Sequence, residues 1–157
     1  EGLQNWRQVF QTIQAAEIWE NHGAWIMRHH PSFGPGVKER FELASRISRG
    51  QRSEADKVRY RIVAQIEELI GDDAILCLPT SPRVAPLRNS PVADIEITYR
   101  NQAAALLCIA GLAGLPQLSL PVAEVDGLPI GYSIIGPRGS DLTLIELATS
   151  LVASVTP

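Results

Sequence analysis

Apolar side chains recur every three to four positions along the first 73 residues, which is the spacing of amphipathic helices. The first stripe runs from residue 3 into the low twenties, with Gly23 and then Pro31 as stop signals. A second stripe begins at Pro35-Gly36 and closes at Gly50, and a third starts at the capping pattern Ser53–Asp56 and ends at Gly71. The pattern therefore predicts three helices, whose inner positions include Leu3, Trp6, Phe10, Ile13, Val37, Phe41, Ala44, Ile47, Val58, Ile62, Ile66 and Leu69.

From residue 74 onward the pattern changes to short apolar runs separated by turn residues, which is typical of buried strands. We expect a strand at 74–78, a proline-rich loop at 80–91 and a buried helix at 99–113 that Gly114 ends. Two further strands, 117–123 and 129–135, are joined through the hairpin signal Asp126-Gly127. The last helix begins at Ser140 or Asp141, with its predicted inner face formed by Leu142, Ile145, Ala148 and Val152.

This order of elements predicts an α/β fold in which the strands of a mixed sheet are covered by helices. Residues 1–73 form the helical part and residues 74–157 the strand-rich part of a single segment. The edges of so small a sheet are exposed, so we expect strands from elsewhere to complete it.

Composition narrows the classes of partner. The chain has 157 residues, 45% of them apolar, and a formal net charge of −3, so it lacks the basic excess of a nucleic-acid binder. Its longest stretch without a polar side chain, Ala103–Pro116, is shorter than the roughly 18 residues that span a bilayer. We expect a soluble protein with neither a nucleic-acid nor a membrane partner.

Cysteine usage points to the cytoplasm. Cys77 and Cys108 both lie in apolar runs, and two cysteines form neither a disulfide framework nor a metal site in a chain of this size. Buried free thiols in a reducing compartment are the expectation, and no charged-then-apolar leader precedes the first helix. No cofactor and no metal is predicted.

Catalytic groups are scarce among these residues. The histidines, His22, His29 and His30, lie near the end of the first helix without the spacing of a metal pair, and no serine lies on a G-x-S-x-G turn. Both lysines lie on charge-rich helix faces, where an ammonium group keeps its charge. Gly136–Asp141 could offer backbone N–H groups to an anion, although a turn followed by a helix cap explains the same residues.

Three segments in order along the chain carry a family resemblance. The segments are Leu78–Pro82 (LPTSP) with Ala85-Pro86, Gly111–Val122 (GLAGLPQLSLPV), and Leu128–Gly136 (LPIGYSIIG) followed by Ser140-Asp141. They resemble the closing motifs of the amidase signature family. Two upstream stretches, at 17–26 (EIWENHGAWI) and 33–36 (FGPG), resemble the indole-3-acetamide hydrolase branch of that family.

The resemblance also implies what this chain lacks. Members of the family use a serine nucleophile, a second serine in a cis peptide and a lysine, with a glycine- and serine-rich stretch as the oxyanion hole. This chain has no Ser-Ser, no Gly-Gly-Ser and no lysine in an apolar strand. It therefore resembles the C-terminal part of such an enzyme, with the catalytic N-terminal part upstream of Glu1 and no catalytic residue of its own.

Three side chains are candidates for substrate binding by the same resemblance. Trp25 matches an aromatic position against the substrate, with burial in the core as the alternative. Arg40 matches a position that grips a substrate carboxylate in some relatives, while its charged neighbours suit an ordinary solvated face. Thr80 follows a strand end, where loops carry function, although its hydroxyl could pair within the proline-rich turn.

The parent would hydrolyse a small amide to a carboxylic acid and ammonia through an acyl-enzyme. This part would complete the sheet and one wall of the substrate pocket and would be inactive alone. Its partners would be the small-molecule amide and either the N-terminal catalytic part or a second copy. Two alternatives stay open: a non-catalytic interaction module, and the amidase subunit of a glutamine-dependent tRNA amidotransferase.

Overall fold

The computed structural model describes residues 2–34 and 36–155 and divides into two compact units, Glu1–Arg61 and Ile62–Pro157. Helix α3 (Arg49–Ile70) runs across the boundary, and the strands of the described residues all follow residue 73. Pro35, at the predicted start of the second helix, lies outside the described residues.

Helix α1 of the first unit covers Leu3–His29, so Gly23 does not stop it, and it ends just before the second predicted stop signal, Pro31. A Cβ atom on Gly23 would come within 2.8 Å of the Trp19 indole, so glycine makes room for this ring inside the helix. A glycine inside a helix costs only about 1 kcal/mol, which the continuing turns outweigh. The helix ends instead at His30, whose left-handed backbone (φ 44°) directs its N–H to the carbonyl of Ile26.

Helix α2 (Val37–Ala44) ends before Gly50, which lies in the first turn of α3 rather than closing α2. The start of α3 is a capping box made by Ser48 and Gln51. The Gln51 N–H donates to Ser48 Oγ (3.2 Å), and the Ser48 N–H donates to Gln51 Oε1 (2.9 Å). The predicted cap at Ser53 is therefore wrong, because the reciprocal bonds form five residues earlier, at Ser48.

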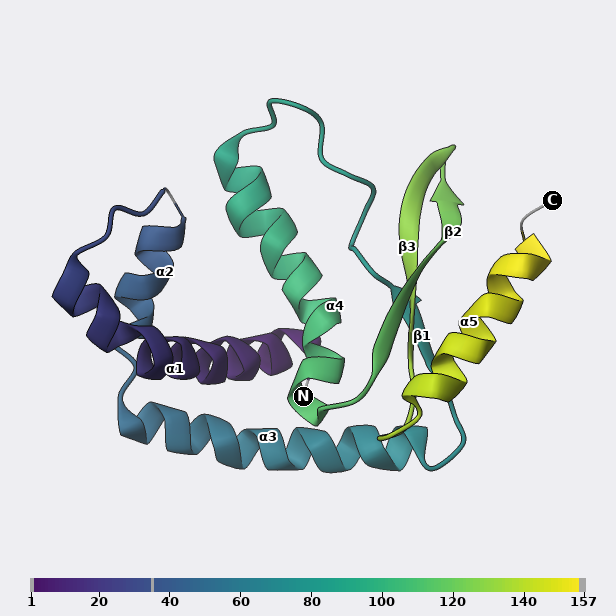
Figure 1. Cartoon of the computed structure of the whole chain (residues 1–157), viewed down its shortest axis with the longest axis horizontal. Coiled ribbons are helices and arrows are strands. Elements are labelled where there is room, and N and C mark those ends of the chain that lie inside the picture. The colour runs from purple at the N-terminus through teal and green to yellow at the C-terminus, as the bar shows by residue number, and fades with distance from the viewer. Residues whose placement is uncertain (1, 35, 156–157) are drawn as a thin grey trace. The chain divides into compact units, whose positions relative to one another are not determined.

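The second unit contains a three-stranded antiparallel sheet in the order β1-β3-β2. Its strands are β1 (Leu76–Pro79), β2 (Gln117–Val125) and β3 (Leu128–Ile135). The predicted hairpin turn is confirmed: Asp126 and Gly127 both have positive φ (51° and 74°), as a type I′ turn requires. Figure 1 shows the hairpin beside β1, with α5 and α4 on opposite sides of the sheet.

A β-bulge interrupts the hairpin. Pro121 and Val122 together lie opposite Gly131, because the pairing jumps by one residue between Leu120 and Ala123. On the side of the bulge away from the turn, Ser119 pairs with Ser133. Without the bulge, the pairing near the turn (Ala123 with Ile130) would instead place Ser119 opposite Ile134. The bulge therefore decides which side chains meet at the far end of the hairpin.

Helical segments precede, separate and follow these strands along the chain. Gly71 (φ 58°) ends α3, a π-helical segment η1 (Asp94–Tyr99) leads into α4 (Arg100–Ala113), and Gly114 (φ 64°) ends α4 as predicted. The last helix, α5, covers Asp141–Val155. None of the described helices is long and apolar enough to cross a membrane.

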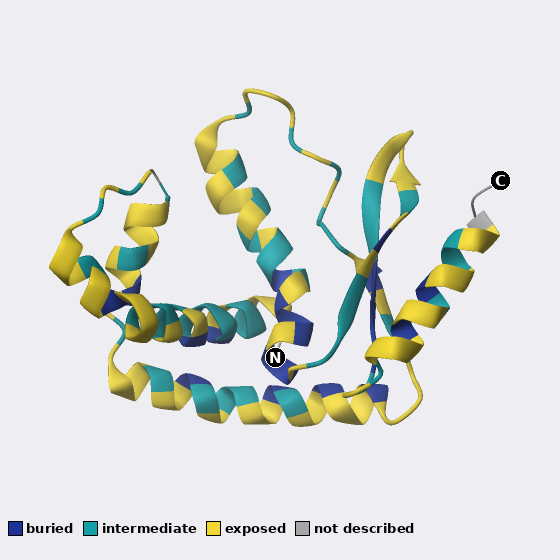
Figure 2. Cartoon of the chain, viewed as in Figure 1, coloured by how far each residue is buried: buried dark blue, intermediate teal, exposed yellow. Residues whose placement is uncertain are grey.

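One core cluster joins α5 to the sheet, through Leu120, Ile134, Leu144 and Ala148. The predicted inner face of α5 is partly wrong, because Leu142 and Ile145 keep 75% and 50% of their surface exposed. Leu144 lies in the cluster instead, so the helix presents Leu142 and Ile145 to solvent. In Figure 2 the burial deepens along β3 towards Ile135, while the tip of the hairpin is exposed.

Candidate functional site

Three hydroxyl groups meet where β1 ends. Thr80 Oγ1 lies 2.7 Å from Ser119 Oγ of β2 and 2.7 Å from Ser133 Oγ of β3. Alternation places them on one face, because Ser119 and Ser133 are cross-strand partners and Thr80 continues the row of Leu78, the partner of Ser133. We call Thr80, Ser119 and Ser133 the hydroxyl cluster.

The backbone around Gly131 builds this cluster. The Thr80 N–H donates to the Gly131 carbonyl at 2.8 Å, which fixes the residue just after β1. A Cβ atom on Gly131 would come within 2.7 Å of Thr80 Oγ1 and 3.0 Å of Ser119 Oγ. The cluster therefore occupies the space that a side chain at position 131 would fill.

The cluster is polar but contains no base. A serine or threonine attacks a carbonyl only when a neighbouring group takes its proton. Within the described residues, the hydroxyls of the cluster hydrogen-bond only to one another. The arrangement can hold and orient a polar group, and it cannot generate a nucleophile by itself.

On the other face of the sheet lies the pair Cys77 and Tyr132. Hydrogen bonding with the Cys77 side chain raises the pKa of the Tyr132 hydroxyl. Cys77 is exposed, so the prediction of a buried thiol is wrong there, because β1 is an edge strand. Cys108 is buried as predicted, and its thiol donates to the Ala105 carbonyl at 3.4 Å.

Trp25 and Arg40 belong to the first unit. Trp25 lies inside α1 with half of its surface exposed among the described residues, and its ring is 5.8 Å from that of His29. Arg40 lies on the exposed face of α2, next to Phe41, which stacks on Phe33 with ring centroids 4.7 Å apart. Thr80 belongs to the second unit, and it pairs across the sheet rather than within the proline-rich turn.

The remaining polar candidates have structural partners. His22 lies edge-on to Phe41, and no group of three metal-ligating side chains gathers in the part of the chain that the structure describes. In the segment 136–141, Arg138 donates to the carbonyls of Ala113 (2.8 Å) and Gly114 (3.2 Å), and thereby closes the end of α4. The Ser140 N–H and hydroxyl both donate to the Pro137 carbonyl (3.1 and 2.7 Å), so the segment is a turn that leads into α5.

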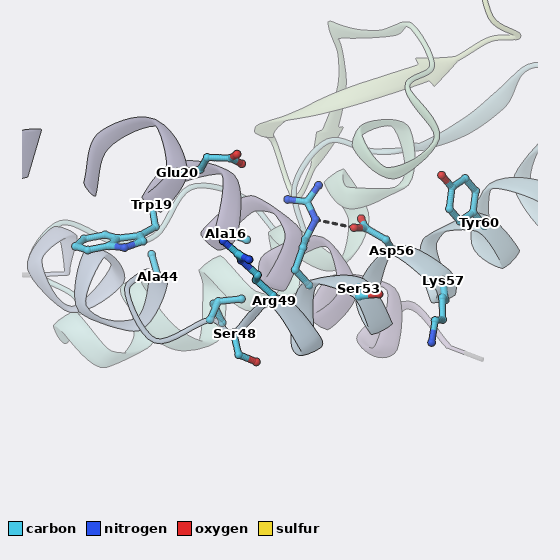
Figure 3. Close-up of a pocket in the computed structure, with 12 residues that line it drawn as sticks. Ala16, Trp19, Glu20, Ala44, Ser48, Arg49, Ser53, Asp56, Lys57 and Tyr60 are labelled. Carbon is cyan, nitrogen blue, oxygen red and sulfur yellow. Dashed lines mark hydrogen bonds and ion pairs between the residues drawn. The ribbon is translucent and has the colours of Figure 1, made fainter. Parts of the chain in front are cut away.

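A groove of about 750 Å³ opens in the first unit between α1, the α2–α3 connection and the start of α3 (Figure 3). Arg52, one of its lining residues, donates to Asp56 (2.9 Å), Glu17 (3.1 Å) and the carbonyl of Ile13 (3.3 Å). The hydrogen bond with Asp56 raises the pKa of Arg52. Because this guanidinium ties α3 to α1, it stabilises the unit rather than offering a charge to a ligand.

Sequence reasoning named Thr80 but missed Ser119, Ser133 and Gly131. All three lie within the motifs LPQLSLPV and LPIGYSIIG, so the motifs themselves were a usable signal. Their meeting depends on the bulge at Pro121-Val122, which no spacing in the sequence announces.

Comparisons with known proteins agree with one another. The family model described as Amidase matches residues 3–145. Amidase 1 of Arabidopsis thaliana is 36% identical over 143 residues, which cover 91% of this chain and 33% of that protein. A glutamyl-tRNA(Gln) amidotransferase subunit of Streptococcus suis is 34% identical over 162 residues, covering 97% of this chain and 32% of that protein.

Solved structures show the same fold. A crystal structure of an amidase superposes with a TM-score of 0.82 at 21% identity, covering 98% of this chain and 36% of that one. This likeness confirms the predicted fold. The chain spans about a third of the length of the curated relatives it matches.

Proposed function

The chain belongs to the amidase family, and from this premise we propose that it is the C-terminal part of an enzyme that hydrolyses a small amide to a carboxylic acid and ammonia. The observation that carries the proposal is the match over residues 3–145 in a chain that covers 33% of its Arabidopsis relative. In the whole enzyme this part would finish the sheet and one wall of the substrate pocket, and an N-terminal part would supply the nucleophile.

The open edges of the sheet support the proposal that a further part of the enzyme adds strands to it. The edge strands β1 and β2 flank β3, so both outer edges of the described sheet can receive further strands. We propose Trp25, Arg40 and Thr80 as the residues that face substrate. The exposed indole of Trp25 suits a flat apolar group, Arg40 a carboxylate, and Thr80 a hydrogen-bonding group.

A chimera tests the proposal directly. The N-terminal two thirds of Arabidopsis Amidase 1, placed before this chain in one polypeptide, should release ammonia from an amide panel that includes indole-3-acetamide. This chain alone and that N-terminal part alone should release none. The two halves are thus each other's controls.

Two results would contradict the proposal. One is ammonia release by this chain alone that disappears when one of its own serines is changed to alanine. The other is a chimera that unfolds cooperatively, and is therefore folded, but releases ammonia from no amide in the panel. The second result would favour a non-catalytic interaction module.

The identity with the Streptococcus protein supports a second candidate, the amidase subunit of a tRNA amidotransferase. Glutamine as the preferred ammonia source of the chimera would favour this candidate, and indole-3-acetamide would favour the first. For either enzyme we propose the cytoplasm as the compartment, because both cysteines are free thiols.

A further inference from the structure

The direction of each backbone group in the sheet follows from two hydrogen bonds. In an antiparallel ladder, successive residues direct their N–H and C=O groups alternately towards one neighbouring strand and away from it. The Thr80 N–H donates to the Gly131 carbonyl (2.8 Å), and the Gly136 N–H donates to the Pro116 carbonyl (3.2 Å). Both bonds give the same phase, in which odd-numbered residues of β3 face β1 and even-numbered residues face β2.

This phase identifies the outer positions of the two edge strands. In β1, Cys77 and Pro79 direct their backbone groups away from β3, because their partners there are even-numbered. In β2, Gln117, Ser119 and Pro121 do the same, because they lie opposite odd-numbered residues. The two prolines lie at outer positions, where the ladder needs no N–H group, and this agrees with the phase.

Both edges can receive a strand by topology, but they differ in protection. On β2, Pro121 lies in the bulge and Glu124 is exposed near the turn, and prolines, bulges and charges are the features that keep a sheet edge from pairing. β1 lies in the run Ala74–Leu78 (AILCL), which carries no charge, and its pairing with β3 has no shift. Such an apolar run is typical of a strand in the interior of a sheet.

We propose that a strand of the N-terminal part of the enzyme pairs with the outer edge of β1, and that β2 stays an outer edge of the whole sheet. The proposal rests on the proposed amidase function, which supplies that N-terminal part. Cys77 would provide the N–H and the C=O for this pairing, and Pro79, the last residue of β1, a C=O alone. Thr80, directly after β1, would then lie where the two parts of the enzyme meet.

Amide hydrogen exchange of the 157-residue chain in dilute solution tests the phase without a partner. The Cys77 and Ser119 amides should exchange quickly, and the Leu78 amide, which faces β3, should be protected. Protection of the Cys77 amide in the isolated chain would overturn the proposal, because its N–H would already have an acceptor.

Exchange in the chimera with the Arabidopsis N-terminal part tests the partner. The Cys77 amide should slow by about tenfold or more, the effect of one added hydrogen bond, while the Ser119 amide should stay fast. Protection of Ser119 alone, or of neither amide, would overturn the pairing. Protection of both would overturn the statement that β2 stays an outer edge.

A proline at position 77 tests the same edge by unfolding. Cys77→Pro removes the donor and blocks a neighbouring strand, so it should lower the urea midpoint of the chimera more than that of the isolated chain. Cys77→Ser keeps the N–H and is the matched control. Gln117→Pro, at an outer position of β2, should change the two proteins equally. An equal loss in both proteins for Cys77→Pro would contradict the pairing.

Ammonia release separates this inference from the proposed function. An active chimera whose Cys77 amide stays unprotected would overturn the pairing and leave the amidase function standing. A folded chimera with a protected Cys77 amide that releases ammonia from no amide would remove the function and leave the pairing.

Discussion

Gly131 is the residue on which the hydroxyl cluster most directly depends. It lies in the middle of β3, where a glycine weakens a strand unless another group needs the space. The Thr80 and Ser119 side chains take that space. At this position the absence of a side chain is therefore a structural requirement.

Replacing Gly131 by alanine should destabilise the chain by about 1–3 kcal/mol, because the new methyl group would overlap the Thr80 side chain. Urea unfolding measures the loss. Gly34→Ala is the control, since a Cβ atom there would meet nothing within 4 Å. Equal midpoints for the two variants would show that the space at position 131 is not filled as described.

The ionisation of Glu39 makes the stability of the start of α2 depend on pH. Backbone N–H groups, its own and that of Gly36 (2.6 Å from Oε2), lower the pKa of this carboxyl. A carboxyl whose pKa is lowered on folding stabilises the folded state above its unfolded pKa, and this contribution disappears as the pH falls through the folded pKa.

The carbon-13 signal of the Glu39 carboxyl should therefore titrate below the ordinary value for glutamate, and the Gly36 amide signal should titrate with it. In Glu39→Gln the Gly36 signal should no longer respond over that pH range. A Glu39 midpoint at or above the ordinary value would refute the hydrogen bond.

At the scale of elements, the ends of the helices carry the main differences between prediction and structure. Gly23 and Gly50 were expected to end helices, and both lie inside one. A glycine stops a helix only when the chain needs its left-handed backbone, as at Gly71 and Gly114, where φ is positive. Composition alone does not separate the two cases, because packing such as that of Trp19 on Gly23 decides between them.

The capping box at the start of α3 provides a direct test of this difference. Ser48→Ala should destabilise the first unit by about 1 kcal/mol, because the Gln51 N–H loses its acceptor. Ser53→Ala, at the cap that the sequence pattern suggested, should be neutral or slightly stabilising, because alanine is the better residue inside a helix. Thermal unfolding followed by circular dichroism compares the two, and a larger loss for Ser53→Ala would contradict the position of the box.

The strands followed from the sequence more closely than the site did. Alternating apolar positions and Asp126-Gly127 were enough to locate the hairpin and its turn. The meeting of Ser119 with Ser133 was not predictable, because it depends on a bulge that shifts the register by one residue. Thr80 could be named from its place after a strand, and its partners required three-dimensional pairing.

At the scale of the whole molecule, α5 leaves an apolar surface uncovered. Leu142 and Ile145 lie one turn apart and are largely exposed, while Leu144 between them fills the core. In an amidase of full length this surface would meet other parts of the protein. In the isolated chain it is free to contact a second copy.

We expect the isolated chain to sediment as a species larger than its 17.1 kDa mass and to bind a hydrophobic dye. Leu142→Lys with Ile145→Lys should move it towards the monomer without changing its circular dichroism. Leu87→Lys, at a more exposed leucine in the loop before α4, is the control and should leave association unchanged. A dye-free monomer for the unaltered chain would contradict the expectation.

The bulge at Pro121-Val122 also divides the hairpin into two stretches whose pairing registers differ by one residue. Between the bulge and the turn, the strands can lose or gain residues in matched pairs, one from each strand, without altering the pairing of Ser119 with Ser133. The exposed tip of the hairpin is therefore a place where length can vary, or where a label or a foreign loop can be inserted, at no cost to the hydroxyl groups at its base.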